Sequence, residues 1–262
     1  MFRLLLPLAA LAVAACTHLP AVNPAPLPWD RSGQMVVVTA SDWNATRGVL
    51  RRFQRDDAGR WQPVGDAQPI VVGRNGSGWG FGLNPAPDAG IASIAAGDPI
   101  KAEGDGRAPA GVFAIGTAFG YAGSADTAMP YQAMDAGDWC IDASGSPLYN
   151  RIVDVDDVGQ AAVEGSTEPM RRDLHADGDQ RYRLGFVIEH NPKALPMAGS
   201  CIFAHLWKTP ETPTAGCTAM APATMDAVLG WLDPAERPVF VLLPDSEYRE
   251  LRARWRLPEL PR

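Results

Sequence analysis

The chain is poor in cysteine, and the few cysteines it has are scattered. Only four of 262 residues are cysteines, at positions 16, 140, 201 and 217. Four are too few to hold a chain of this length together as a disulfide scaffold. No two of them have the close C-x2-C spacing typical of a zinc site. The sequence therefore argues against a disulfide-dense domain and a cysteine zinc site, and we expect neither a metal nor another cofactor.

Basic residues and long hydrophobic runs are also scarce. Lys and Arg total 23 against 30 for Asp and Glu, which gives a net charge of −7. Proteins that bind nucleic acids usually present a basic face, so this balance argues against a nucleic-acid partner. The longest apolar run lies near the N-terminus and has about ten residues, too few to span a bilayer as a helix.

The abundant residue types indicate a globular β protein. Hydrophobic residues make up 46% of the chain and charged residues 20%, which is close to the average for proteins that bury a core. The 26 glycines and 24 prolines favour many turns and short strands over a helical bundle. No internal repeat is visible. The length fits one large domain or two small ones.

The first residues have the features of a secretory signal. Arg3 supplies a positive start, Leu4 to Val13 form the apolar stretch, and small residues precede Cys16. This arrangement resembles a bacterial lipoprotein signal, in which residues 1–15 are removed and Cys16 receives the lipid. By analogy with bacterial sorting rules, Thr17 favours an outer-membrane position, facing the periplasm. The alternative is an ordinary signal peptide cleaved near Ala15, with Cys16 incidental.

Residues 16–33 are expected to form a tether. Prolines stand at positions 20, 24, 26 and 28, and proline at this density favours an extended polyproline-like conformation. The tether would hold the folded domain, residues 34–262, away from the surface of a membrane. The partners expected from this segment are therefore membrane lipids, reached through the lipid anchor.

The domain is predicted to be mostly β with a few short helices. Eight β-type runs are separated by clusters of turn residues: Met35–Thr39, Val49–Gln54, Ile70–Val72, Val112–Ile115, Leu148–Val155, Tyr182–Ile188, Cys201–His205 and Val239–Leu243. Helical spacing of apolar residues predicts helices at Ala221–Leu232 and Ser246–Trp255, the second with Ser246 as a cap. A third helix is predicted near Gly90–Ala96.

Cys217 and His205 are the candidate catalytic residues. Gly216 precedes Cys217, and a predicted helix follows within a few residues, so backbone N–H groups there can converge on one point. Such groups lower a thiol pKa and bind an oxyanion. His205 ends a predicted strand twelve residues earlier, and an imidazole is a suitable base for a thiol. The spacing alone leaves open that both residues are structural.

The sequence segments around these two residues resemble those of the L,D-transpeptidase catalytic domain family, whose fold is called YkuD-like. The site words are Gly199-Ser-Cys-Ile-Phe-Ala-His205 and Pro213-Thr-Ala-Gly-Cys217. Further words resemble a subgroup of secreted bacterial members, in order from residue 79 to 234: Trp79-Gly-Phe-Gly, Lys101-Ala-Glu-Gly-Asp-Gly-Arg-Ala-Pro-Ala-Gly-Val-Phe113, Phe119-Gly-Tyr-Ala122, Pro130-Tyr131, Trp139-Cys-Ile-Asp142, Leu148-Tyr-Asn150 and Gly230-Trp-Leu-Asp-Pro234.

The resemblance implies a YkuD-like β-sandwich and a cysteine acyltransferase. Cys217 would attack the carbonyl of meso-diaminopimelate in a peptidoglycan stem peptide, and His205 would carry the proton. An amine would then resolve the thioester to a crosslink. Backbone N–H groups at Gly216 and Cys217 are the candidates for an oxyanion hole. The sequence departs from the family pattern at Ala215, where many members have a second His, and at Ala219, where many have Asn or Arg.

Three further expectations concern the remaining residues and the assembly. Once Cys16 and Cys217 are assigned, Cys140 and Cys201 remain, and an even pair in an oxidising periplasm is expected to form a disulfide. The alternative is two buried thiols. Trp207, two residues after His205, is the candidate for a substrate-binding aromatic side chain. The protein is expected to be a monomer.

Two other functions stay open on the sequence. One is hydrolysis by the same cysteine, which would trim the stem peptide as an L,D-carboxypeptidase or cleave a link between a protein and peptidoglycan. The other, from a different class, is a lipoprotein that binds peptidoglycan without catalysis. A domain that only binds has no need of the Cys217 and His205 pair, so the sequence favours an enzyme.

Overall fold

The strands of the protein form a closed ring. In this computed structural model, residues 25–84 and 97–261 are described. The ring contains eight strands in the order β5-β10-β11-β12-β3-β2-β1-β13, with β13 returning to β5. Their bounds are β1 Gln34–Ala40, β2 Arg47–Arg55, β3 Trp61–Val71, β5 Ala108–Gly120, β10 Leu184–Ile188, β11 Phe203–Leu206, β12 Thr218–Met220 and β13 Val239–Pro244. The mostly β class is therefore confirmed, whereas two packed sheets are not, because the strands close into one barrel.

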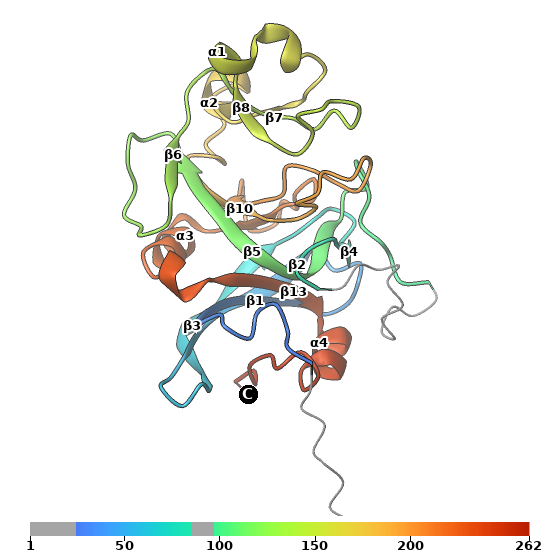
Figure 1. Ribbon diagram of the computed structural model, residues 1–262, viewed down its shortest axis with the longest axis vertical. Helices are drawn as coiled ribbons and strands as arrows, with labels where there is room; N and C mark the ends of the chain where they lie inside the picture. The colour runs from blue at the N-terminus through green and yellow to red at the C-terminus, as the bar shows by residue number, and fades with distance from the viewer. Residues whose placement is uncertain (1–24, 85–96, 262) are drawn as a thin grey trace, which may run out of the picture.

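The long strand β5 joins the barrel to its edge strands. It pairs with β13 through its first half and with β10 through its second half. Two short strands add to it in parallel, β4 (Ser77–Trp79) at its start and β6 (Tyr131–Ala133) at its end. Figure 1 shows β5 running diagonally from the barrel toward a separate group of elements.

That group is a small lobe on one end of the barrel, drawn in yellow and yellow-green in Figure 1. It consists of a three-stranded sheet in the order β8-β7-β9 and short helices. Its elements are β7 Asp138–Cys140, β8 Ile152–Asp154, α1 Val155–Val158, the 3-10 turn Gln160–Ala162, β9 Glu168–Pro169 and α2 Arg172–His175. We call residues 134–179 the lobe. The chain leaves the barrel after β6 and re-enters it at β10, so the lobe is one insertion between neighbouring strands.

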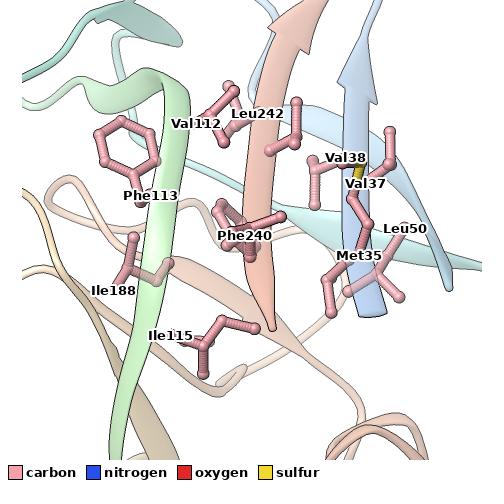
Figure 2. Packing of buried hydrophobic residues seen from close by; sticks show 14 of the residues in the cluster. Met35, Val37, Val38, Leu50, Val112, Phe113, Ile115, Ile188, Phe240 and Leu242 are labelled. Carbon is pink, nitrogen blue, oxygen red and sulfur yellow. The ribbon is translucent and has the colours of Figure 1, made fainter. Parts of the chain in front are cut away.

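The main core lies around β1 and β13. Both strands are rich in β-branched and long apolar residues, and every residue of each is buried. Uninterrupted apolar runs of this kind are typical of strands covered on both faces. Figure 2 shows side chains from these strands and from β5 packed together, among them Met35, Phe113 and Phe240. An eight-stranded barrel leaves only enough room inside for side chains to fill.

Two helices complete the core. Helix α3 (Pro222–Leu229) begins with proline, which suits the first helical position because it lacks an N–H that would be unpaired there. Helix α4 (Asp245–Leu251) buries Tyr248 and Leu251. A 3-10 turn, Pro234–Glu236, precedes β13. Within the described residues, no helix is both long and apolar enough to cross a membrane.

The packed domain begins earlier than the expected boundary at residue 34. Trp29 is fully buried, and its indole N–H donates to the carbonyl oxygen of Trp255 at 2.8 Å. Leu27 packs against the same core. Residues 25–33 are therefore not a free tether, because a buried tryptophan outweighs the preference of the nearby prolines for an extended chain. The signal peptide, Cys16, the rest of the tether and the helix predicted near Gly90–Ala96 lie outside the described residues.

All eight predicted β runs coincide at least in part with strands, and their bounds differ from the observed ones where turns intervene. Leu148–Val155 was expected to be one strand, but only Ile152–Asp154 is extended, because Asp154 caps helix α1 through the N–H of Asp156. Ser246 does not cap α4, which begins at Asp245 after Pro244. Most of β3 escapes prediction because it contains two prolines and exposed polar residues, which a strand with an open edge tolerates.

Candidate functional site

The candidate site is a cavity of about 270 Å³ between the barrel and the lobe. Both predicted residues, Cys217 and His205, line it. Its other lining residues come from the barrel and its loops (Arg74, Lys101, Glu103, Gly104, Arg181, Tyr182, Ser200, Cys201, Ile202, Thr214, Ala215 and Gly216) and from the lobe (Asp142, Thr167, Glu168 and Arg172). The site therefore depends on the lobe as well as on the two segments that the sequence singled out.

The register of β11 and β12 brings the two predicted residues to one face. The strands are parallel, and His205 pairs with Ala219, two positions after Cys217. Side chains two positions apart on a strand point to the same side. The backbone N–H of Phe203, two positions before His205, donates to Cys217 Sγ at 3.3 Å. The imidazole on β11 and the thiol just before the neighbouring strand β12 thus line the same cavity.

Cys217 sits in a turn that Thr214 organises. The Thr214 hydroxyl donates to the carbonyl oxygen of Cys217 at 2.6 Å and accepts from the N–H of Gly216 at 3.1 Å. Gly216 has a φ of 155°, and a Cβ there would lie 3.0 Å from the carbonyl oxygen of Arg107. The turn leads directly into β12, so no helix begins at the cysteine. Helix α3 starts only at Pro222, which removes a helix N-terminus from the surroundings of the thiol.

One of the two expected oxyanion-hole donors, the N–H of Gly216, is engaged within the turn. This N–H is already held by the Thr214 hydroxyl, so it is not free to bind an oxyanion in this conformation. An N–H that donates within the turn would have to give up that bond before it could donate to a substrate. The backbone N–H of Cys217 is the candidate that remains.

The imidazole of His205 is fixed by a backbone carbonyl. Its Nδ1 lies 2.8 Å from the oxygen of Leu206. A carbonyl oxygen only accepts, so Nδ1 carries the proton and Nε2 has the free lone pair that a general base needs. The ring of Tyr182 packs edge-on against it with centroids 5.1 Å apart. These contacts hold one tautomer and one ring orientation.

Both groups are neutral in the resting protein. Burial lowers the pKa of His205 to about 4, and the charges of Arg181 and Arg172 act in the same direction. Burial raises the pKa of Cys217 to about 12, and the nearby carboxylate of Glu168 raises it further. The N–H of Phe203 opposes this shift but does not reverse it. The pair is therefore a thiol and an imidazole, not a preformed thiolate and imidazolium.

Glu168, Tyr182 and Arg172 form a cluster beside the cysteine that the sequence did not reveal. Glu168 forms an ion pair with Arg172 at 3.2 Å and a side-chain hydrogen bond with Tyr182. Burial raises the pKa of the Glu168 carboxyl, and burial and the Glu168 charge raise that of the Tyr182 hydroxyl. No motif marks these residues, because Glu168 and Arg172 belong to the lobe and meet the cysteine only through folding.

Lys101, Glu103 and Gly104 also line the cavity. Lys101 is buried and forms an ion pair with Asp105 at 2.7 Å. Glu103 accepts hydrogen bonds from the hydroxyl of Ser200, at 2.7 Å, and from that of Tyr149. This segment thus forms a polar turn of the site, and its hydrogen bond to Ser200 holds the chain next to Cys201 in place.

The disulfide expected from the cysteine count is present. Cys140 of β7 is bonded to Cys201, which stands two residues before β11, and Cys217 is the free buried cysteine of the described chain. The carbonyl oxygen of Cys201 lies 3.5 Å from Cys217 Sγ. The bond therefore ties the lobe to the segment that carries both Phe203 and His205.

Trp207 does not line the cysteine cavity. It is half-buried and lines a neighbouring pocket of about 730 Å³. Of the two positions that depart from the family pattern, Ala215 is exposed and lines the cysteine cavity, whereas Ala219 is buried in β12. The positive charges at the cavity come from elsewhere in the chain, namely Arg74, Lys101, Arg172 and Arg181.

Among the described residues, one group of acidic side chains has the spacing of a cation site. Oxygens of Asp135, Asp138 and Asp154 lie within 4.8 Å of one another in the lobe. Asp138 is buried, and its two oxygens accept hydrogen bonds from the side chain of Gln132 and from the N–H of Asp135. These bonds account for the group as a structural cluster, and none of its members lines the cysteine cavity.

Comparisons with known proteins leave the family open. No protein-family model matches the chain, and neither the curated proteins nor the solved structures include a significant match. The case for a function therefore depends on the site and on the sequence words quoted above.

Proposed function

We propose that this protein is a cysteine-dependent L,D-transpeptidase that acts on the stem peptides of peptidoglycan. The observation that carries the proposal is the pairing of a free thiol, Cys217, with a histidine whose Nδ1 proton is held by a carbonyl, in one cavity. A nucleophile next to a base that a third group orients is the general arrangement of covalent catalysis. The substrate class comes from the resemblance of the surrounding words to the L,D-transpeptidase family.

In the first step, His205 Nε2 takes the thiol proton while Cys217 Sγ attacks the carbonyl of the diaminopimelate residue. The C–N bond to the next residue breaks, and the imidazolium returns its proton to the leaving amine. The product is a thioester. Because the resting pair is neutral, proton transfer accompanies the attack, and no separated charges are held in the buried cavity beforehand.

In the second step, an amine attacks the thioester and loses a proton to His205. The thiol is regenerated, and the new amide bond forms a crosslink. Water in place of the amine gives a trimmed stem peptide, which is the carboxypeptidase alternative. The resemblance of the surrounding sequence to the L,D-transpeptidase family favours transfer over hydrolysis.

A lipoprotein that only binds peptidoglycan is the second candidate. It would need the cationic cavity but not the oriented imidazole. The Leu206 carbonyl bond to His205 fixes a tautomer that leaves Nε2 as a base in a residue that lines the cavity, a feature that binding alone does not require. We therefore place this candidate second. Under either proposal, Cys16 carries the lipid that holds the domain at the outer membrane, facing the periplasm.

Incubation of the soluble domain with purified muropeptides, followed by mass analysis, tests the proposal. Transpeptidation yields a dimer with the loss of one D-Ala, and hydrolysis yields a tripeptide. Cys217→Ser should abolish both products, because a hydroxyl is poorly activated by the same histidine. His205→Ala should slow them by about 10²–10⁴-fold. Intact conversion by the serine variant would exclude Cys217 as the nucleophile.

A further inference from the structure

The pocket of about 730 Å³ next to the cysteine cavity has a strongly cationic lining. Arg172, Arg181, Arg183 and Lys208 line it, against two carboxylates, Asp177 and Asp179. The other wall includes Trp207. The protein as a whole carries a net charge of −7. An excess of positive charge in one concave region of an acidic protein is a feature that attracts anionic ligands.

The charges of this pocket are only partly neutralised. Asp179 accepts hydrogen bonds from Arg172 Nε at 2.8 Å and from Arg181 Nη2 at 2.5 Å. This pairing fixes the two guanidinium groups in position. Arg183 and Lys208 are exposed, and no ion pair of either is found within the described residues. Two cations are therefore free to meet a ligand, beside two that are rigidly held.

The pocket adjoins the cysteine cavity. Arg172 and Arg181 line both this pocket and the cysteine cavity. The pocket also lies on the histidine's side of the thiol: Leu206, whose carbonyl holds His205 Nδ1, and Trp207 belong to its wall. A ligand in the pocket would consequently approach the thioester from the side of the base.

In acyl transfer, a carboxylate of the substrate lies on the side of His205. The amine that leaves takes its proton from His205, and the amine that enters gives its proton to His205, so both occupy the same place by microscopic reversibility. A C-terminal residue that leaves as a free amino acid carries a carboxylate next to its amine.

We propose that the pocket formed by Arg172, Arg181, Arg183 and Lys208 binds the free carboxylate of the amine-side component of the reaction. This inference rests on the proposed function, and it adds the chemical class of the group that the site selects: an amino acid residue with an unblocked carboxylate. Arg183 and Lys208 contact the carboxylate, and the Asp179-held pair Arg172 and Arg181 orients it. Trp207 covers the apolar part of the residue.

Binding of two labelled stem tetrapeptides to the full chain carrying Cys217→Ala provides the test. One peptide ends in a free carboxylate, and the other is the C-terminal amide of the same sequence. The free acid should bind about tenfold more tightly than the amide, and its dissociation constant should rise with salt, because exposed charges are screened. With Arg183→Gln and Lys208→Gln together, the preference should fall below about twofold.

Arg254→Gln is the matched control, since Arg254 is an exposed arginine that lines neither cavity. It should keep the tenfold preference, and equal melting temperatures of all variants will show that folding is intact. Equal binding of acid and amide to the parent chain, or a preference that survives the double substitution, would overturn the inference. If the native chain did not convert muropeptides but kept the carboxylate preference, the result would contradict the proposed function and not the binding of the carboxylate.

Discussion

The backbone N–H of Phe203 donates to the sulfur of Cys217 at 3.3 Å, across two strands that pair in parallel. This contact fixes the thiol beside the strand that carries His205, two positions further on. It also shows how the site is organised, because one strand provides both the donor to the nucleophile and the base.

The alkylation rate of Cys217 should rise steadily with pH. With the thiol pKa raised to about 12 by burial, the thiolate fraction increases about tenfold per pH unit between pH 7 and 10. Iodoacetamide labelling of the Cys16→Ser chain, followed by intact-mass measurement, would give the rate. A plateau that begins between pH 6 and 8 would contradict the neutral pair and indicate a thiolate–imidazolium pair.

Glu168→Gln should make Cys217 more reactive at a given pH. The carboxylate disfavours the thiolate nearby, so its neutral replacement lowers the thiol pKa and increases the labelling rate several-fold at pH 8. Glu164→Gln serves as the control, because Glu164 is exposed and does not line the cavity. An unchanged rate in the Glu168 variant would mean that its charge is not felt at the sulfur.

Unfolding should become easier as pH falls from 6.5 to 4, in part because of the buried His190. Burial lowers its pKa to about 4, so the unfolded chain binds the proton first, and the free energy of unfolding rises with pH in this window. The contribution is present above pH 6.5 and amounts to at most about 3 kcal/mol. Raised carboxyl pKa values, such as that of Glu168, act with the opposite sign.

Urea unfolding of the wild type and of His190→Gln at pH 7.5 and pH 5 isolates the histidine. The wild type should lose more stability between the two pH values than the variant does. The same slope in both proteins would show that His190 does not titrate in this window.

Removal of the Cys140–Cys201 disulfide should loosen the site as well as the fold. The bond closes a loop of 61 residues, worth about 4 kcal/mol in the chain-entropy model. Reduction or Cys140→Ser should lower the melting temperature and weaken substrate binding, because Glu168 and Arg172 reach the cavity from the lobe. Thiol counting on the denatured, unreduced Cys16→Ser chain should give one free thiol, and a count of three would refute the bond.

Cys16→Ser should release the protein from membranes into the soluble periplasmic fraction. An acyl chain contributes about 0.8 kcal/mol per buried CH₂ to membrane binding, and no helix of the described residues can span the bilayer. Fractionation at high salt, with the unaltered chain as the reference, measures the effect. A variant that stays with the membrane would contradict lipidation as the anchor.

The local sequence predicted the strands whose burial is uniform. Val36 to Val38 and Val239 to Leu243 are apolar without interruption, and they form the most buried strands of the barrel. Such runs can be recognised in the sequence because the same residues both favour a strand and fill the core. The cysteine pair could be predicted for a comparable reason, since removing Cys16 and Cys217 leaves one combination.

The properties of the candidate site came from residues distant in the chain. The sequence singled out Cys217 and His205, but not the Leu206 carbonyl bond or the nearby Glu168. It suggested the N–H of Gly216 for an oxyanion, and the Thr214 hydroxyl holds that N–H instead. Hydrogen-bond partners and pKa values depend on which segments pack together, and a linear pattern does not record this.

The sequence by itself determined a mostly β chain, its strongest strands, the disulfide pair and the two residues at which to look for chemistry. Only the tertiary structure decided that the sheet closes into a barrel, that Trp29 belongs to the core, and that Arg172 and Arg181 supply positive charge next to the thiol. The physical reason is that the pattern of apolar residues along a segment reflects which of its side chains are buried. Closure and charge placement are instead set by contacts between segments that the chain brings together only when it folds.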